Sequence, residues 1–231
     1  MSVSSEQRQR FLSARSGAIA GMVGPPMFLG ILALLDLVDR QVEVSGHELG
    51  RAGLLMHLNF LAFGVLTLAF ATALRTGVRP GTLAWVGTAL LWLFGLGPVL
   101  ATFTFDPGSG GPTTWHGTLH DVGFLLVALS LIPACFVFAW LFRKDRRWHG
   151  FQWYSLATGI ALAAVVFAPS TSPGDSYPIW TGPASMLELV LECAWLALVA
   201  VRLWQLTRQT EWRGSGSRVG TTTTTAMIEE R

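Results

Sequence analysis

Charged side chains are scarce in this sequence. Only 13% of its 231 residues are Asp, Glu, Lys or Arg, whereas 51% are hydrophobic and the mean hydropathy is +0.48. Soluble domains carry about 25% charged residues, so this composition excludes an ordinary soluble globular protein. The formal net charge is only +2, and we therefore expect no nucleic-acid partner.

Cysteine is almost absent as well. Cys135 and Cys193 both fall inside apolar segments, where a thiol usually behaves as a small apolar group. Two such residues do not make a disulfide framework or a thiolate metal site. The sequence also lacks a phosphate-binding loop, a nucleophile elbow and a dinucleotide fingerprint.

Long apolar segments make up most of what is present. There are six of them, at approximately 16–38, 52–74, 81–104, 117–142, 151–170 and 183–205. Each has about 20 residues or more, enough to cross a hydrocarbon core of about 30 Å as an α-helix. The sequence therefore predicts an all-α polytopic membrane bundle of six transmembrane helices over residues 16–207.

The segments on either side of this membrane domain are polar. Residues 1–15 are expected to form a short cytoplasmic lead. The tail, residues 208–231, contains a Gly-Ser-Gly-Ser run and five consecutive threonines. Such a composition cannot bury apolar area, so we expect a disordered cytoplasmic tail.

Basic residues predict the orientation. Fourteen of the sixteen Lys and Arg residues precede the first segment, follow the second or fourth, or lie at or beyond the end of the sixth. The opposite gaps hold only Arg40 and Arg51. By the positive-inside rule, both termini are cytoplasmic and the first, third and fifth loops face outward.

Ionisable side chains within or next to the predicted spans concentrate near the outward end. A charge at a helix centre costs about 2.5–3.5 kcal/mol on insertion scales, so such residues are candidates for function. Five of the six spans contribute them: Asp36, His57, Asp106, His116, His120, Asp121, Glu188 and Glu192.

His116 and His120 could hold a transition metal. They are four residues apart, so both imidazoles lie on one helical face. This spacing holds one ion, zinc being possible, if Asp106 or His57 supplies a third ligand, and Asp121 could orient one imidazole. Alternatively, His116 is an interfacial residue and His120 is hydrogen-bonded within the bundle.

Glu188 and Glu192 share a face of the last predicted span. At 1.5 Å per residue, Glu192 would lie about 13 Å below Pro183, close to the bilayer midplane. An unpaired ionised carboxylate at that depth is costly, so it should be protonated or partnered. The pair could act as a general base, a proton relay or a buried structural pair.

Several short motifs together resemble the domain of unknown function 998 family, six-helix membrane proteins of bacteria and archaea. They are Gly24-Pro25, Leu49-Gly50 with Asn59-Phe60 and Gly64, Phe105-Asp106-Pro107, and His116-Gly117-x-x-His120. The resemblance covers residues 16–207. It implies a six-helix fold in a prokaryotic plasma membrane and indicates Asp106, His116 and His120 as a shared site. It implies no established activity, and Glu188 and Glu192 have no place in the pattern.

Three functions stay open. In a metal-dependent membrane hydrolase, Glu188 or Glu192 would be the general base beside zinc. The sequence also has a looser similarity to zinc-binding membrane hydrolases, in residue types only. In a proton-coupled transporter, Glu192 and His57 would titrate, and Gly24-Pro25-Pro26 would break the first helix. In a structural or accessory protein with membrane lipids as partners, the polar cluster would be a packing network. A b-type haem between His57 and His120 is a further alternative.

Overall fold

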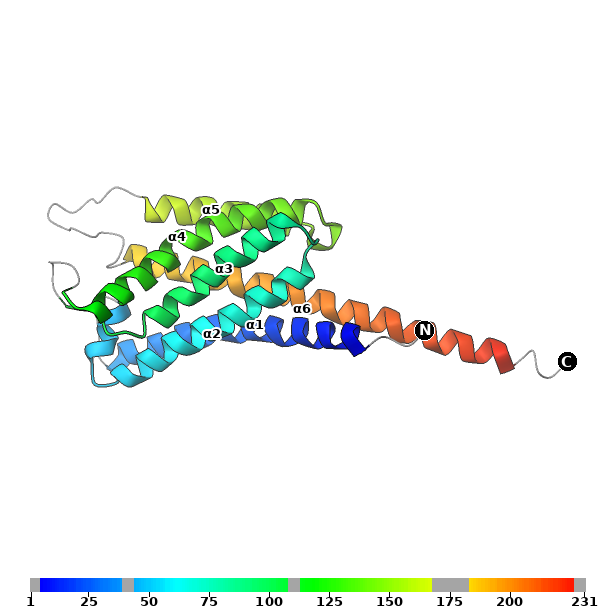
Figure 1. Ribbon diagram of the computed structural model, residues 1–231, viewed down its shortest axis with the longest axis horizontal. Helices are drawn as coiled ribbons and strands as arrows, with labels where there is room; N and C mark the ends of the chain where they lie inside the picture. The colour runs from blue at the N-terminus through cyan, green and yellow to red at the C-terminus, as the bar shows by residue number, and fades with distance from the viewer. Residues whose placement is uncertain (1–4, 39–43, 108–112, 168–182, 227–231) are drawn as a thin grey trace.

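The computed structural model describes residues 5–38, 44–107, 113–167 and 183–226 (Figure 1). This part of the chain is helical and contains no β-strand. Its elements are α1 (Ser5–Val38), η1 (Val44–Leu49), α2 (Gly53–Gly77), α3 (Thr82–Leu100), α4 (Trp115–Arg143), η2 (Arg146–Trp148), α5 (Phe151–Val166) and α6 (Pro183–Ala226), where η denotes a short 3₁₀-helix.

Five of the helices are long and apolar enough to cross a membrane. The candidate spans are Leu12–Val38, Gly53–Gly77, Thr82–Leu100, Trp115–Arg143 and Ala184–Gln209. The predicted all-helical, membrane-embedded class of fold is thus confirmed. The fifth predicted span corresponds to α5, which is apolar but has only 16 residues. The rest of that predicted segment, 168–170, lies outside the described residues.

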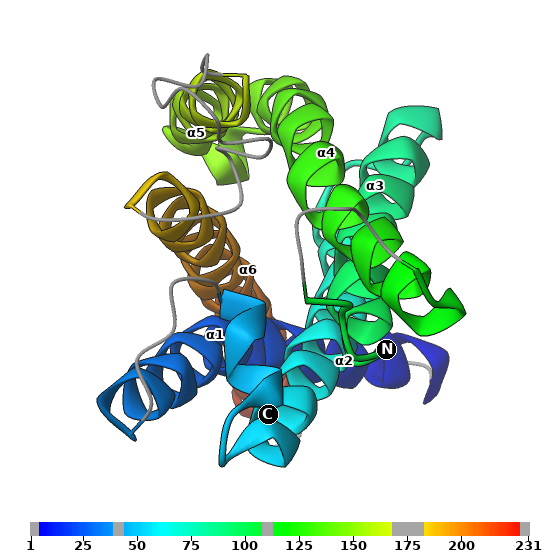
Figure 2. The ribbon, with the colours of Figure 1, turned by 90° about the vertical axis from the view of Figure 1, so that its left-hand side faces the viewer.

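The helices form a ring when viewed along the bundle (Figure 2). Helices consecutive in the sequence pack side by side from α1 to α5, and α6 packs against α1 and, less extensively, against α5. This order follows from short connections, which force consecutive helices to run antiparallel as neighbours. One described bond across the α5–α6 junction is buried: the Trp195 indole donates to Ser155 Oγ at 3.0 Å.

Two helices differ from their sequence expectations. Although Pro25 and Pro26 lie inside α1, its helical assignment is continuous from Ser5 to Val38. The broken helix of the transporter alternative is therefore wrong for this segment. Helix α6 continues past the apolar span that ends at Gln209 and reaches Ala226, across residues for which the sequence predicts disorder.

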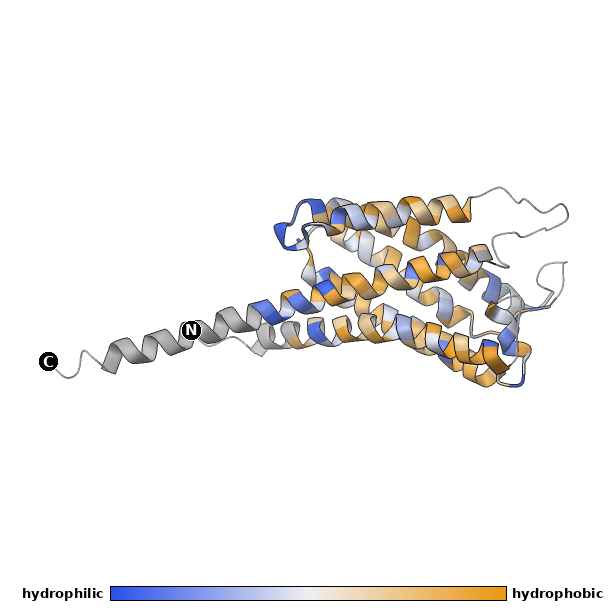
Figure 3. Ribbon diagram, turned by 180° about the vertical axis from the view of Figure 1, so that it is seen from behind, coloured by the Kyte–Doolittle hydropathy of each residue, from blue (hydrophilic) through white to orange (hydrophobic). Residues whose placement is uncertain are grey.

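Apolar side chains occupy both the interior and the outer surface of the bundle. Large aromatic residues such as Phe70, Phe94 and Trp195 are fully buried, while leucines such as Leu54 and Leu187 are exposed. Hydrophobic colour covers the helix bodies, and hydrophilic residues gather at the α4–α5 connection and where α6 leaves the ring (Figure 3). Helices that are apolar all round are typical of membrane spans.

The end of the bundle that contains η2, called the η2 end below, is closed by polar and aromatic contacts. Arg147 binds Asp145, with Nη2 2.6 Å from Oδ2, and this hydrogen bonding lowers the pKa of Asp145 although burial opposes it. The Trp148 indole donates to Gly77 O at 3.2 Å, and the Arg202 guanidinium donates to Arg147 O. These bonds join η2, which follows α4, to the C-terminal end of α2 and to the middle of α6.

Helices α3 and α4 approach each other closely at two glycines. A Cβ added at Gly97 would lie 2.6 Å from Gly123 O, and one added at Gly123 would lie 2.5 Å from Gly97 O. Small residues permit this distance between helix backbones, as is common in membrane bundles.

Replacing Gly123 by alanine should therefore destabilise the protein. The added methyl group meets backbone atoms that cannot rotate away, so we expect a loss of about 1–3 kcal/mol, the usual cost of overpacking. The matched control is Gly30→Ala in α1, where an added Cβ meets no described atom within 4 Å. Thermal unfolding in detergent should show a lower midpoint for Gly123→Ala alone; equal midpoints would contradict the close approach.

Candidate functional site

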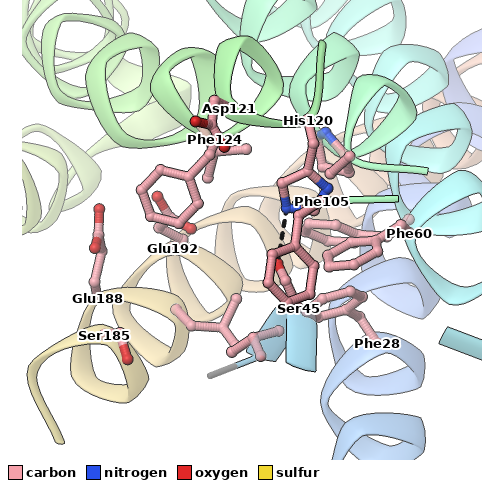
Figure 4. A pocket seen from close by; sticks show the side chains of 16 residues that line it. Phe28, Ser45, Phe60, Phe105, His120, Asp121, Phe124, Ser185, Glu188 and Glu192 are labelled. Carbon is pink, nitrogen blue, oxygen red and sulfur yellow. Dashed lines mark hydrogen bonds between the residues drawn. The ribbon is translucent and has the colours of Figure 1, made fainter. Parts of the chain in front are cut away.

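A cavity of ≈ 150 Å³ lies near the opposite end of the bundle, called the η1 end (Figure 4). Its apolar wall contains the aromatic residues Phe28, Phe60, Phe63, Phe105 and Phe124. Its polar lining consists of Ser45, His120, Asp121, Ser185, Glu188 and Glu192. Apolar walls with a few convergent polar groups are typical of small-molecule sites.

The connection between α3 and α4 is held by one carboxylate. Asp106 Oδ2 accepts hydrogen bonds from Thr113 N at 2.8 Å and from Thr114 N at 2.7 Å, and the Thr114 hydroxyl donates to the same carboxylate at 2.8 Å. Thr114 Oγ1 in turn accepts from Gly117 N at 3.1 Å, which caps the start of α4. These residues form what we call the Asp106 clasp: Asp106, Thr113, Thr114 and Gly117.

Gly117 belongs to the clasp because it leaves room for the carboxylate. A Cβ at this position would lie 2.3 Å from Asp106 Oδ2, so any larger residue would displace Asp106. Desolvation opposes ionisation of Asp106, but the hydrogen bonds from Thr114 and Thr113 outweigh it and keep the pKa of Asp106 below its usual value.

His116 lies beside the clasp. Its Nδ1 is 2.8 Å from Thr104 O and 3.9 Å from Asp106 Oδ1. A carbonyl oxygen only accepts hydrogen bonds, so we assign the proton of the neutral ring to Nδ1. The side chain is 37% exposed, and His116 is not among the residues that line the cavity.

His120, one turn further along α4, is buried and lines the cavity. Its Nδ1 is 2.8 Å from Phe103 O, and its Nε2 is 2.9 Å from Ser45 Oγ. The carbonyl again assigns the proton to Nδ1, which leaves Nε2 as an acceptor. The Ser45 hydroxyl therefore donates to His120, and the dashed line in Figure 4 marks this contact.

Glu48 lies near the other ring nitrogen of His120, Nδ1. Glu48 Oε1 is 3.7 Å from His120 Nδ1 and has no hydrogen-bond partner in the described structure, while Oε2 accepts from Phe105 N at 3.4 Å. Burial raises the pKa of Glu48 to about 8, and the hydrogen bond from Phe105 offsets only part of this effect.

Glu188 and Glu192 face the cavity from α6. Their residues are only 5% and 2% exposed, and Glu188 Oε1 has no hydrogen-bond partner among the described residues. Figure 4 shows the two carboxylates on one side of the cavity and the Ser45–His120 pair on the other. A buried carboxylate oxygen without a partner is costly, so a bound group that supplies a positive charge or a hydrogen would stabilise it.

The structure thus brings together some of the predicted site residues. His120, Glu188 and Glu192 line one cavity, whereas Asp106 and His116 are engaged at the α3–α4 connection and His57 is not a lining residue. No three His, Cys, Asp or Glu side chains in the described ranges converge to hold a metal ion. The metal-ligand and general-base roles of these residues stay predictions without support from this arrangement.

Ser45 and Glu48 are site residues that the sequence did not predict. Both lie in η1, within a connection that the sequence presents only as a short segment of mixed charge. No spacing rule relates Ser45 to His120, because the two are 75 positions apart. One signal was available in the sequence: Glu48 is an acidic residue directly before an apolar span, and such a residue is a candidate for function.

The apolar helices and the cavity between them define an integral membrane protein with a candidate small-molecule site. The model of the family described as protein of unknown function (DUF998) matches residues 40–202. The chain therefore belongs to this family, which confirms the resemblance, although the match begins after α1 and does not include Gly24-Pro25. Searches of the curated proteins and of the solved structures found no match.

The raised pKa of Glu48 predicts a pH-dependent stability. Folding raises the pKa of Glu48 from 4.5 to about 8. Between these pH values the folded protein therefore binds one proton more than the unfolded chain. The contribution is complete below pH 4.5 and is lost as the pH rises through 8. We expect the midpoint of thermal unfolding in detergent to fall by several degrees between pH 5 and 9.

Glu48→Gln is the matched variant for this prediction, because it keeps the shape of the side chain and cannot ionise. Its unfolding midpoint should fall less over the same pH range. If both proteins showed the same pH profile, another group would be responsible for the loss.

Proposed function

We propose that this protein binds an amphipathic, cationic small molecule in the cavity at the η1 end. The observation that carries the proposal is an oxygen of Glu188 that has no hydrogen-bond partner among the described residues and is buried beside Glu192 in a cavity with aromatic walls. Neither carboxylate could remain ionised there without compensation, and a ligand cation supplies it.

The chemistry of the lining suits both parts of such a ligand. Phe28, Phe60 and Phe63 offer apolar contact for a hydrocarbon chain, and the face of Phe124 beside the α6 carboxylates can attract a cation. Glu188 and Glu192 then act as binding residues and His120 as a hydrogen-bonding residue. This assignment gives the buried carboxylates a role in binding. A role in a metal-dependent hydrolase would require a third convergent metal ligand.

The proposal includes a topology of six spans with both termini in the cytoplasm of a prokaryotic cell. Helix α5 would be the sixth span, since its 16 residues give about 24 Å of helix, antiparallel to α4. Helix α1 begins and α6 ends at the same end of the bundle (Figure 1). Basic residues concentrate at the η2 end, so the positive-inside rule places that end in the cytoplasm and the cavity toward the outside.

Fusions to the C-terminus test this topology. Green fluorescent protein fused after Arg231 should fluoresce, and alkaline phosphatase at the same position should be inactive, because the first folds in the cytoplasm and the second outside it. Fusions after Arg79, in the connection between α2 and α3, should give the same result. An active phosphatase at the C-terminus with an inactive one after Arg79 would mean an odd number of spans beyond α2 and would overturn the six-span topology, whereas activity at both positions would overturn the cytoplasmic orientation.

The ligand class is tested with two probes of equal chain length and opposite charge. Decyltrimethylammonium should bind saturably to the protein in lipid nanodiscs, and decyl sulfate should not. Removing one carboxylate charge with Glu188→Gln or Glu192→Gln should weaken binding at least about tenfold, which corresponds to about 1.4 kcal/mol. Microscale thermophoresis below the micellar concentration measures both affinities.

Leu187→Ala is the matched control on the same helix. Leu187 is adjacent to Glu188 but exposed on the outer face of α6, so its loss should leave the affinity unchanged. Equal affinity for the two probes, or full affinity in both glutamine variants, would refute the proposal. A purely structural role of the carboxylates predicts a changed unfolding midpoint without any saturable binding.

A further inference from the structure

We propose that Ser45 and His120 form a nucleophile–base pair that hydrolyses a carboxylic ester of a molecule held in the cavity. This activity goes beyond binding, and it rests on the proposed function only in needing the cavity to admit a ligand. The substrate class is an amphipathic ester, and the products are the carboxylic acid and the alcohol.

The hydrogen bond between Ser45 and His120 has the direction that a nucleophile–base pair requires. Ser45 Oγ is 2.9 Å from His120 Nε2, within the range required of a serine nucleophile and its general base. Because Nδ1 carries the ring proton, Nε2 has the free lone pair that must accept the serine proton. The opposite tautomer would place a donor against the hydroxyl and could not activate it.

The other ring nitrogen of His120, Nδ1, has a hydrogen-bond acceptor. In serine hydrolases, an acceptor on Nδ1 holds the ring in the productive tautomer and stabilises the imidazolium that forms. Here the acceptor is Phe103 O at 2.8 Å, with Glu48 Oε1 3.7 Å from the same nitrogen. Phe103 and Glu48 act through His120 and are therefore positioning residues.

Ser45 and His120 also lie where a bound molecule would contact them. Both members of the pair line the cavity, and Phe28 and Phe60 lie next to them in its wall. The Phe60 and Phe105 rings flank His120 at centroid distances of 6.5 and 5.6 Å. An acyl chain packed on these rings would bring its ester carbonyl to the same part of the cavity as Ser45.

The reaction needs only the ester and water. Ser45 Oγ forms a bond to the carbonyl carbon while its proton passes to His120 Nε2. The C–O bond to the leaving alcohol then breaks, and His120 returns the proton to that alcohol, which leaves an acyl group on Ser45. Water attacks the acyl carbon, giving up one proton to His120, and the carboxylic acid departs as that proton returns to Ser45.

Covalent labelling of the full chain in nanodiscs tests the pair. A fluorophosphonate probe should modify the wild-type protein, and peptide mapping should place the adduct on Ser45. His120→Gln can still donate to Phe103 O but cannot take a proton, so we expect the labelling rate to fall about 100-fold. Hydrolysis of p-nitrophenyl decanoate should be lost in Ser45→Ala and fall in parallel with labelling in His120→Gln.

Ser16→Ala is the control, because Ser16 lies on an exposed part of α1 and donates only to Leu12 O within the described structure. It should label and hydrolyse like the wild type. Absence of an adduct on Ser45 in wild-type protein with a normal unfolding midpoint would overturn the proposal. If that same protein still bound decyltrimethylammonium saturably, the proposed binding function would stand. Labelling of Ser45 without such binding would instead refute the proposal of a cationic ligand and leave the esterase proposal intact.

Discussion

The arrangement of the cavity depends on one carboxylate, that of Asp106. Its bonds to Thr113 and Thr114 fold the α3–α4 connection back onto the first turn of α4. This fold sets the carbonyl groups of Thr104 and Phe103 against His116 and His120. The ring protons are thereby placed on Nδ1, and His120 presents a free lone pair to Ser45. Asp106 thus contributes to the position of His120 without lining the cavity itself.

The buried carboxylates at the two ends of the bundle differ in their partners. At the η2 end, Asp145 has a guanidinium partner and Trp148 is buried against Phe142, with ring centroids 4.2 Å apart. At the η1 end, Glu48 and Glu188 each have a buried oxygen with no hydrogen bond to the described residues. Unsatisfied buried groups reduce stability and are retained where they serve a function. Glu48 and Glu188 are thus the buried carboxylates on which the proposed roles of the η1 end depend.

Helix positions were largely predictable from sequence, because a lipid environment allows only long apolar helices for such segments. The predicted segment 117–142 falls within α4, 52–74 begins one residue before α2 and otherwise lies within it, and 81–104 contains α3. Convergence of His120, Glu188 and Glu192 was also predictable, since ionisable groups in spans face the interior. The partners of His120 were not predictable, because Ser45 approaches it only through tertiary packing. Likewise, the engagement of Asp106 and His116 depends on loop hydrogen bonds that leave no periodic signal.

The contact between α1 and α6 has a consequence for how the protein is made. Phe28 on the first helix and the two glutamates on the last line the same cavity, so no partial chain can contain a complete one. During synthesis, α1 enters the membrane first and must wait for α6 before the ring closes. Until then, Glu188 and Glu192 have no enclosed site to occupy, and the insertion of α6 is the step that creates the cavity.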